Sequence, residues 1–184
     1  MRARLGITKS NFVLEDRIEK NFQENGYEII YPETMSIYDQ FSYYSRATNL
    51  VFAEGSALFL ADMVASSRQS VAIIHRRSPA PAVFGSRMRA AGVASALEIA
   101  AVEGHILPTR PGSLSEAQLR NTSPTLLDFK QLGHRLELGG FTTKAWSVPT
   151  EPEIARAVEE VIAQKEARHP GEEFGLRRLQ RREL

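Results

Sequence analysis

The sequence predicts an α/β fold with a mainly parallel sheet. Short apolar runs alternate along the chain with segments whose apolar residues recur at helical spacing. Strands that alternate with helices are typical of parallel sheets, because each helix carries the chain back to start the next strand. The 184 residues are 42% hydrophobic and 24% charged, a balance typical of a globular protein of about one domain.

The first half of the chain shows this alternation most clearly. Leu14, Ile18 and Phe22 recur at steps of four and form one apolar stripe of a helix. Ser36, with Asp39 three residues later, predicts the start of a second helix. The expected elements are a helix from Ser10 or Asn11 to Gly26, a strand at 27–31, a helix from Ser36, a strand at 49–53, a helix at 56–67 and a strand at 70–74.

The second half of the chain is less regular, with prolines at several points. Helix caps stand out at Ser123-Pro124 and at Thr150 with Glu153, and Gly139-Gly140 is placed to end a helix. The expected elements are a loop at 76–81, a short helix with Phe84, Met88 and Ala91, a strand at 97–102, a loop at 105–113, a helix from Ser123-Pro124 to Gly139-Gly140 and a helix from Thr150 that includes Ile162.

We expect one domain over residues 1–168 and a basic tail over 169–184. The tail is rich in arginine and lacks periodicity, so we expect it to be loosely ordered unless a partner covers it. Doubly wound domains normally begin on a strand, whereas only Met1 to Ile7 precede the first helix here. The domain is therefore expected to be truncated at its N-terminus, with an exposed sheet edge that would favour a homo-oligomer.

Composition argues against several classes of partner. The net charge of +1 does not favour nucleic acid, and the chain has no cysteine for disulfides or thiolate metal sites. His105 and His134 lack metal-ligand spacing, so no metal is expected. Apolar runs such as 70–74 are far shorter than the roughly 20 residues of a transmembrane helix. No signal peptide opens the chain, and a soluble, cytoplasmic protein is the expectation.

The best candidate site is the turn from the strand at 49–53 into the helix at 56–67. Ligands of open α/β sheets bind at the carboxyl ends of the strands. Gly55 allows close approach of a ligand, and the small side chains of Ser56 and Ala57 leave the helix amides open for an anion such as a diphosphate. In the alternative interpretation, Gly55 serves only a tight turn and Ser56 only caps the helix.

The stretch from Glu15 to Leu58 resembles the catalytic domain of glycosyltransferase family 61. That family shows a Gly-aromatic-Glu strand, a Pro-Glu pair, a helix with Glu-Gln or Asp-Gln and a strand that ends in a small-residue turn. The matching residues here are Glu15, Gly26-Tyr27-Glu28-Ile29-Ile30, Pro32-Glu33, Met35-Ser36-Ile37, Asp39-Gln40 and Glu54-Gly55-Ser56-Ala57-Leu58.

The resemblance implies the C-terminal, Rossmann-like half of a GT-B type enzyme. Such a half binds a nucleotide-sugar donor without a cofactor or an essential metal, and a missing N-terminal domain would supply the acceptor. The implied reaction transfers a sugar to a hydroxyl of a glycan or another acceptor, in polysaccharide biosynthesis. Helix N-termini and basic side chains would stabilise the departing diphosphate.

The resemblance also assigns candidate site residues. Glu54 stands where many members carry histidine, and it is a candidate catalytic base or a partner for sugar hydroxyls; alternatively, it caps backbone N–H groups of the turn. Gln40 and Glu15 match family positions and are candidate substrate-binding residues, although an amide brace and a helix-dipole partner are alternatives. Arg4 (or Arg2) corresponds to the arginine that ends the family's first strand.

His75 completes the candidate substrate-binding set, since it ends the strand at 70–74 on the same side as the Glu54 turn, next to Arg76 and Arg77. The cluster could hold a phosphate or an acidic acceptor, or consist of solvated loop charges. Two alternatives to an enzyme of family 61 remain open. One is a non-catalytic module that binds a nucleotide-sugar or a partner, and the other is an unrelated Rossmann-like enzyme such as a sugar-nucleotide epimerase.

Overall fold

A computed structural model describes residues 12–81, 83–110, 112 and 115–179 of the chain. Its helices are α1 (Glu15–Glu24), α2 (Ile37–Arg46), α3 (Ala57–Ala61), α4 (Val83–Ala90), α5 (Glu116–Thr122), α6 (Phe129–Leu138) and α7 (Glu151–Arg168), with a 3-10 helix at Pro32–Thr34. Its strands are β1 (Asn49–Ala53), β2 (Ser70–Ile74), β3 (Ser95–Ile99), β4 (Val102–Pro108), β5 (Thr125–Leu127) and β6 (Phe174–Arg178).

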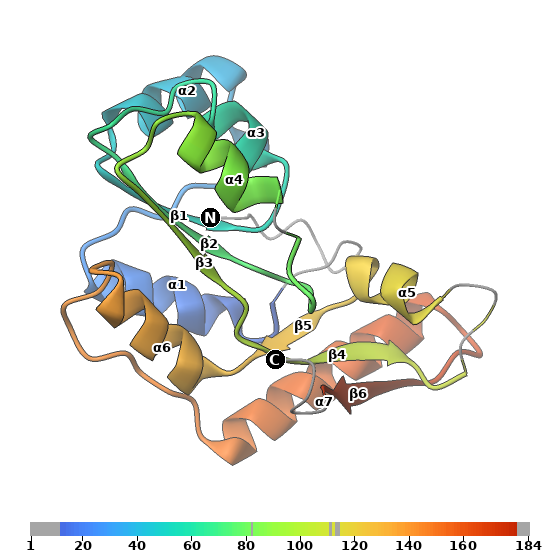
Figure 1. Cartoon of the computed structure of the whole chain (residues 1–184). Coiled ribbons are helices and arrows are strands. Elements are labelled where there is room, and N and C mark those ends of the chain that lie inside the picture. The colour runs from blue at the N-terminus through green and yellow to red at the C-terminus, as the bar shows by residue number, and fades with distance from the viewer. Residues whose placement is uncertain (1–11, 82, 111, 113–114, 180–184) are drawn as a thin grey trace.

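The first sheet is parallel and has the strand order β1-β2-β3. Helices α2, α3 and α4 cover one face, and α1 and α6 cover the other (Figure 1). In the central strand, Val71 and Ile73 pack on the first face, and Ala72 and Ile74 pack on the second. A strand buried on both faces has to be apolar at every position, which explains the continuous run at 71–74.

The second sheet is antiparallel, with the order β5-β4-β6. Only Ala100 and Ala101 separate β3 from β4, so the chain runs from one sheet directly into the other (Figure 1). Helix α7 packs against this sheet through Ile154 and Val158, which share a core with Ile106 of β4 and Leu126 of β5.

The α/β class and the parallel sheet are confirmed, whereas the antiparallel sheet differs from expectation. The expected loop at 105–113 begins inside β4, which extends to Pro108. The helix expected from Ser123-Pro124 begins only at Phe129, after Asp128 accepts a hydrogen bond from the Gln131 amide. Residues 125–127 pair with β4 instead, because this buried pairing outweighs the helical spacing of Leu126 with Phe129.

The two helix caps predicted from adjacent residues are confirmed. The Ser36 hydroxyl accepts the Asp39 N–H at 3.1 Å, and Thr150 forms the predicted capping box with Glu153. Other elements also differ from expectation. Residues 27–31 form no strand, and α3 ends at Ala61 rather than at Ser67, so that Met63 lies beyond the helix and is 70% exposed.

The tail is more ordered than expected over part of its length. Residues 174–178 form β6, which pairs antiparallel with β4, and Arg178 forms an ion pair with Glu103. The boundary at residue 168 stays a prediction. No helix within the described ranges is long and apolar enough to cross a membrane.

Candidate functional site

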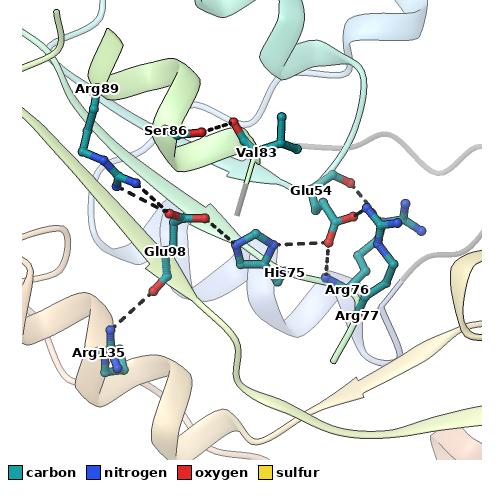
Figure 2. Close-up of polar contacts among 9 residues, drawn as sticks. All are labelled: Glu54, His75, Arg76, Arg77, Val83, Ser86, Arg89, Glu98 and Arg135. Atoms are coloured by element: carbon teal, nitrogen blue, oxygen red, sulfur yellow. Dashed lines mark hydrogen bonds and ion pairs between the residues drawn. The ribbon is translucent and has the colours of Figure 1, made fainter. Parts of the chain in front are cut away.

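Three polar residues meet at the carboxyl ends of the parallel strands. Glu54 directly follows β1, His75 directly follows β2, and Glu98 lies next to the last residue of β3. The ladder continues beyond the strands, since the Glu54 N–H donates to Ile74 O at 2.8 Å and the His75 N–H donates to Ile99 O at 2.9 Å. The in-register pairing therefore brings these residues side by side (Figure 2).

His75 lies between the two carboxylates. Its Nδ1 is 3.3 Å from Glu54 Oε2, and its Nε2 is 3.2 Å from Glu98 Oε2. His75 is 0% exposed and Glu54 is 1% exposed, whereas 25% of the Glu98 side chain is exposed. An ionised carboxylate only accepts hydrogen bonds, so both contacts form together only if both ring nitrogens carry a proton or if one carboxyl is protonated.

An arginine stands at each end of this arrangement. Arg77 forms an ion pair with Glu54, and Arg89 NH1 lies 3.5 Å from Glu98 Oε1. Each of the two carboxylates beside His75 thus has a guanidinium group on its outer side, a pattern that limits the cost of burying Glu54. We call this set the charge row: Arg77, Glu54, His75, Glu98 and Arg89 (Figure 2).

Glu54 is the most heavily bonded member of the charge row. Besides His75 and Arg77, its Oε2 accepts the backbone N–H of Arg76 at 3.1 Å, and its carbonyl accepts Arg76 Nε at 3.0 Å. Burial alone would raise the pKa of Glu54. The hydrogen bonds from His75, Arg77 and the Arg76 amide outweigh burial and lower this pKa to about 2. Glu54 is therefore an ionised anchor of the loop that follows β2.

Helix α4 leaves room for Glu98 at one point. A Cβ atom placed on Gly85 would lie 1.8 Å from Glu98 Oε1 and 2.2 Å from its Cδ. Any side chain at this position would therefore displace the Glu98 carboxylate. The absence of a side chain at Gly85 allows Glu98 to reach His75 from the neighbouring strand.

A hollow of about 410 Å³ adjoins the Arg77 end of the charge row. Arg77 NH1 donates to Asn121 Oδ1 at 3.1 Å, and Arg120 NH1 donates to Ser78 O at 3.0 Å, so both guanidinium groups are held in place. We call this space the arginine hollow; its lining residues are Arg77, Ser78, Pro79, Pro81, Ala117, Arg120 and Asn121.

The loop after β2 is also tied to the antiparallel sheet. The Thr125 hydroxyl donates to Arg76 O at 2.9 Å and lies 3.3 Å from His105 Nδ1. A hydroxyl has one proton to donate, so His105 Nδ1–H is the donor in the second contact. The second sheet thus braces the loop that carries Arg76 and Arg77.

The Glu54 turn itself differs from expectation in one respect. Helix α3 has five residues and Ser56 makes no side-chain cap, so it offers a weaker anion site than the longer helix expected at 56–67. Gly55 does not have a positive φ, and a Cβ atom there would meet only Ala53 O, at 3.8 Å. The backbone therefore does not require glycine at this position, and what Gly55 contributes is open space above the turn.

Two of the other candidate residues, Gln40 and Glu15, lie in helices α2 and α1. Gln40 Nε2 donates to Pro32 O at 2.7 Å and to Met35 O at 3.3 Å, so this amide braces the start of α2. Glu15 lies buried in the first turn of α1. Arg4, like Arg2, lies outside the described residues.

Residues 5–71 match the family model of Glycosyltransferase 61. This part of the chain is similar to family 61 glycosyltransferases. The similarity supports a general role in glycosyl transfer, in agreement with the resemblance of Glu15 to Leu58. No curated protein and no solved structure matches the chain.

The family 61 match includes β1 and the Glu54 turn but ends inside β2. Most of the charge row, including His75 and Glu98, thus lies beyond the matched residues. Sequence reasoning missed Glu98, Arg89 and Arg120. A charged residue within the apolar run at 97–102 was a usable signal for Glu98, whereas nothing local pointed to the other two. Across the described ranges, no cluster of three histidine or acidic side chains is arranged to hold a metal ion.

Proposed function

We propose that this chain is the donor-binding part of a glycosyltransferase, which transfers a sugar from a nucleotide-sugar to a hydroxyl acceptor. One observation carries the proposal. The turn that belongs to the family 61 match is also the point where the parallel sheet presents its charge row, with the arginine hollow beside it. Carboxyl ends of parallel strands are the usual ligand site of open α/β sheets.

The donor diphosphate would lie over the Glu54 turn and against the arginine hollow. Gly55, Ser56 and Ala57 leave the turn open, and Arg77 and Arg120 supply positive charge. Fixed guanidinium groups stabilise the charge that develops on a leaving diphosphate, because they need no reorganisation during the reaction. In this proposal the protein uses neither a metal nor a cofactor.

Glu54 is better suited to positioning than to proton abstraction. A general base works best with a pKa near the operating pH, and the pKa of Glu54 is about 2. Its oxygens are engaged by His75, Arg76 and Arg77. We therefore propose that Glu54 holds His75 and Arg77 at the donor site and that another group removes the acceptor proton.

Further parts of the proposal rest on the resemblance to family 61. They are the Rossmann-like, GT-B type architecture with a separate acceptor domain, roles for Gln40, Glu15 and Arg4 near the substrate, a glycan acceptor, polysaccharide biosynthesis and a cytoplasmic location. The homo-oligomer expected from the exposed sheet edge is likewise a proposal.

A non-catalytic nucleotide-sugar-binding module is the second candidate function. It is favoured by the surroundings of Glu54, whose carboxylate is buried and lies against His75 and Arg77 rather than solvent. In such a module the charge row would only shape the pocket, and the chain would bind a donor without transferring its sugar.

Calorimetric titration with a panel of nucleoside diphosphates and their sugar conjugates tests the donor site. We expect Arg120→Ala to weaken binding by about tenfold or more, since a hydrogen bond to a charged group is worth about 1.5–3 kcal/mol. Gly55→Val should also weaken binding, because its side chain fills the open space above the turn. Arg46→Ala, on the exposed surface of α2, is the matched control and should bind as the parent chain does. Absence of binding to every compound in the panel would refute the donor site.

Donor turnover separates the two candidate functions. Sugar released from a bound donor, with water as the acceptor, would favour the enzyme. Tight donor binding without any release, under conditions where the chain is folded, would favour the module.

A further inference from the structure

His75 takes part in two contacts that each need a proton. Its Nδ1 is 3.3 Å from Glu54 Oε2, its Nε2 is 3.2 Å from Glu98 Oε2, and the ring is 0% exposed. Each contact is a hydrogen bond only if a proton lies between the nitrogen and the oxygen. A neutral imidazole supplies one of these protons, so the second belongs either to an imidazolium ring or to a protonated carboxyl.

The surroundings of the two carboxyl groups place the second proton on His75. Burial raises the pKa of Glu54, but hydrogen bonds from His75, Arg77 and the Arg76 amide outweigh it and lower this pKa to about 2. Glu98 has 25% of its side chain exposed, and Arg89 NH1 lies 3.5 Å from its Oε1. Water and an adjacent cation both favour an ionised carboxylate. The histidine ring is therefore the group that carries both protons.

Strand register and helix packing hold Glu98 at this contact (Figure 2). In the ladder between β2 and β3, Glu98 is the partner of Ile73, two residues before His75. From α6, Arg135 NH2 donates to Glu98 O at 3.4 Å. From α4, the absence of a side chain at Gly85 leaves the space that the carboxylate occupies. The contact with His75 is thus built into the packing of β3 between two helices.

A cationic His75 changes the net charge behind the Glu54 turn. The charges of Glu54 and Arg77 cancel within their ion pair, so a neutral ring would leave these three residues without net charge. With an imidazolium ring they carry one positive charge. The negative charge of Glu98 lies on the far side of the ring and has Arg89 as its own partner. A positive charge close to the turn attracts an anion more strongly than a neutral turn does.

We propose that Glu98 is a positioning residue of the donor site. By accepting the Nε2 proton, Glu98 holds His75 as an imidazolium, and this buried cation strengthens the attraction of the Glu54 turn for a diphosphate. The inference rests on the proposed donor site. Glu98 acts through His75 and Glu54 and does not itself touch the donor.

NMR of the ring nitrogens tests the charge of His75 without any ligand. In the parent chain at neutral pH, both ring nitrogens of His75 should carry a proton. In Glu98→Gln, the side-chain amide can donate to Nε2, so the ring should become neutral with Nε2 unprotonated. An unprotonated ring nitrogen in the parent chain would place the second proton on a carboxyl and overturn the proposal.

Gly85→Ala is a second variant that does not depend on the folding of Glu98→Gln. Its methyl group would displace the Glu98 carboxylate while the charge stays in the chain, so Nε2 should again lose its proton. A ring that remains doubly protonated in both variants would show that Glu98 does not hold the second proton, and would overturn the proposal.

Glu103→Gln in the antiparallel sheet is the matched control. The side chains of Glu103 and Glu98 are both 25% exposed, and each forms an ion pair with an arginine whose side chain is 56% exposed. The partner of Glu103 is Arg178, and this pair includes no histidine. Glu103→Gln should therefore leave both protons on His75.

Calorimetric titration with inorganic diphosphate links the charge of His75 to the donor site. Glu98→Gln should weaken diphosphate binding by about threefold or more, because a nearby positive charge is lost, whereas Glu103→Gln should bind as the parent chain does. Equal affinities of the parent chain and a folded Glu98→Gln would overturn the role of Glu98 and leave the donor site standing. Absence of binding by the parent chain would instead refute the donor site, and the role of Glu98 with it.

Discussion

The two sheets each bury one histidine completely, in opposite surroundings. His75, at the end of the parallel sheet, lies between the carboxylates of Glu54 and Glu98, with arginines beyond them. His105, within β4 of the antiparallel sheet, is also 0% exposed but contacts the hydroxyl of Thr125. The same degree of burial therefore accompanies a row of charges in one sheet and a hydrogen bond to a neutral hydroxyl in the other.

The difference shows which of the two sheets brings charged side chains together. Parallel strands in register place their ends at one edge of the sheet, so polar residues that follow separate strands meet there. Antiparallel strands end at opposite edges, and β4 instead places His105 in its middle. The parallel sheet is thus suited to hold a charged ligand, and the antiparallel sheet is suited to brace the loop that carries Arg76.

The largest expected effect comes from Glu54→Ala. This change leaves Arg77 and His75 without their buried carboxylate partner, which should lower the free energy of unfolding by about 3–5 kcal/mol. Urea denaturation followed by circular dichroism measures it. Thr125→Val is the control in the other sheet and should cost only about 1–2 kcal/mol, because it removes a neutral hydroxyl. Equal losses in the two variants would contradict the distinction between the sheets.

The pH dependence of stability should be set in part by Glu54. Its pKa falls from an ordinary value of 4.5 to about 2 in the folded chain, so the unfolded chain binds this proton more readily. The stabilisation is therefore complete above about pH 5 and is lost as the pH falls toward 2, in total about 3 kcal/mol. Denaturation at a series of pH values measures it, and Glu54→Gln should flatten the profile. An unchanged slope in Glu54→Gln would exclude this carboxyl as the source.

Gly85→Ala should break the charge row at Glu98. The new methyl group would overlap the Glu98 carboxylate and push it away from His75, at a cost of about 2 kcal/mol. NMR of the His75 ring nitrogens reports the lost contact directly. Gly55→Ala is the matched control, since its methyl group meets only Ala53 O, and it should leave stability and the His75 signals unchanged. Unaltered His75 signals in Gly85→Ala would show that Glu98 does not depend on this glycine.

Gly104→Ala in β4 should have an effect of similar size, confined to the antiparallel sheet. A Cβ atom there would lie 2.7 Å from Arg177 O, so the backbone of β6 would have to move, at a cost of about 2 kcal/mol. Hydrogen exchange should become faster at 174–178, while the His75 signals stay as in the parent chain. A change at His75 would show that the two sheets are more tightly coupled than their separate ladders indicate.

Much of the parallel half could be predicted because its signals are local. The Ser36 cap, the strand at 70–74 and the Glu54 turn each depend on a few adjacent residues. Residues 125–127 could not be assigned in this way, because their helical spacing competes with a pairing to β4 about twenty residues earlier in the chain. The strand predicted at 27–31 does not form for a related reason. Its residues are β-prone, but a strand also needs a neighbouring strand to pair with, and none of the described strands pairs with this segment.

The sequence by itself determined the α/β class, the parallel strands at 49–53 and 70–74 and the Glu54 turn as the candidate site, because hydrophobic spacing and caps act over a few residues. Only the tertiary structure decided that Glu98 reaches His75 over Gly85, that Arg120 joins Arg77 at one hollow, and that β1 has only β2 as a neighbour among the described strands. These contacts join residues far apart in the chain, and they depend on strand register and helix packing, which local spacing does not encode.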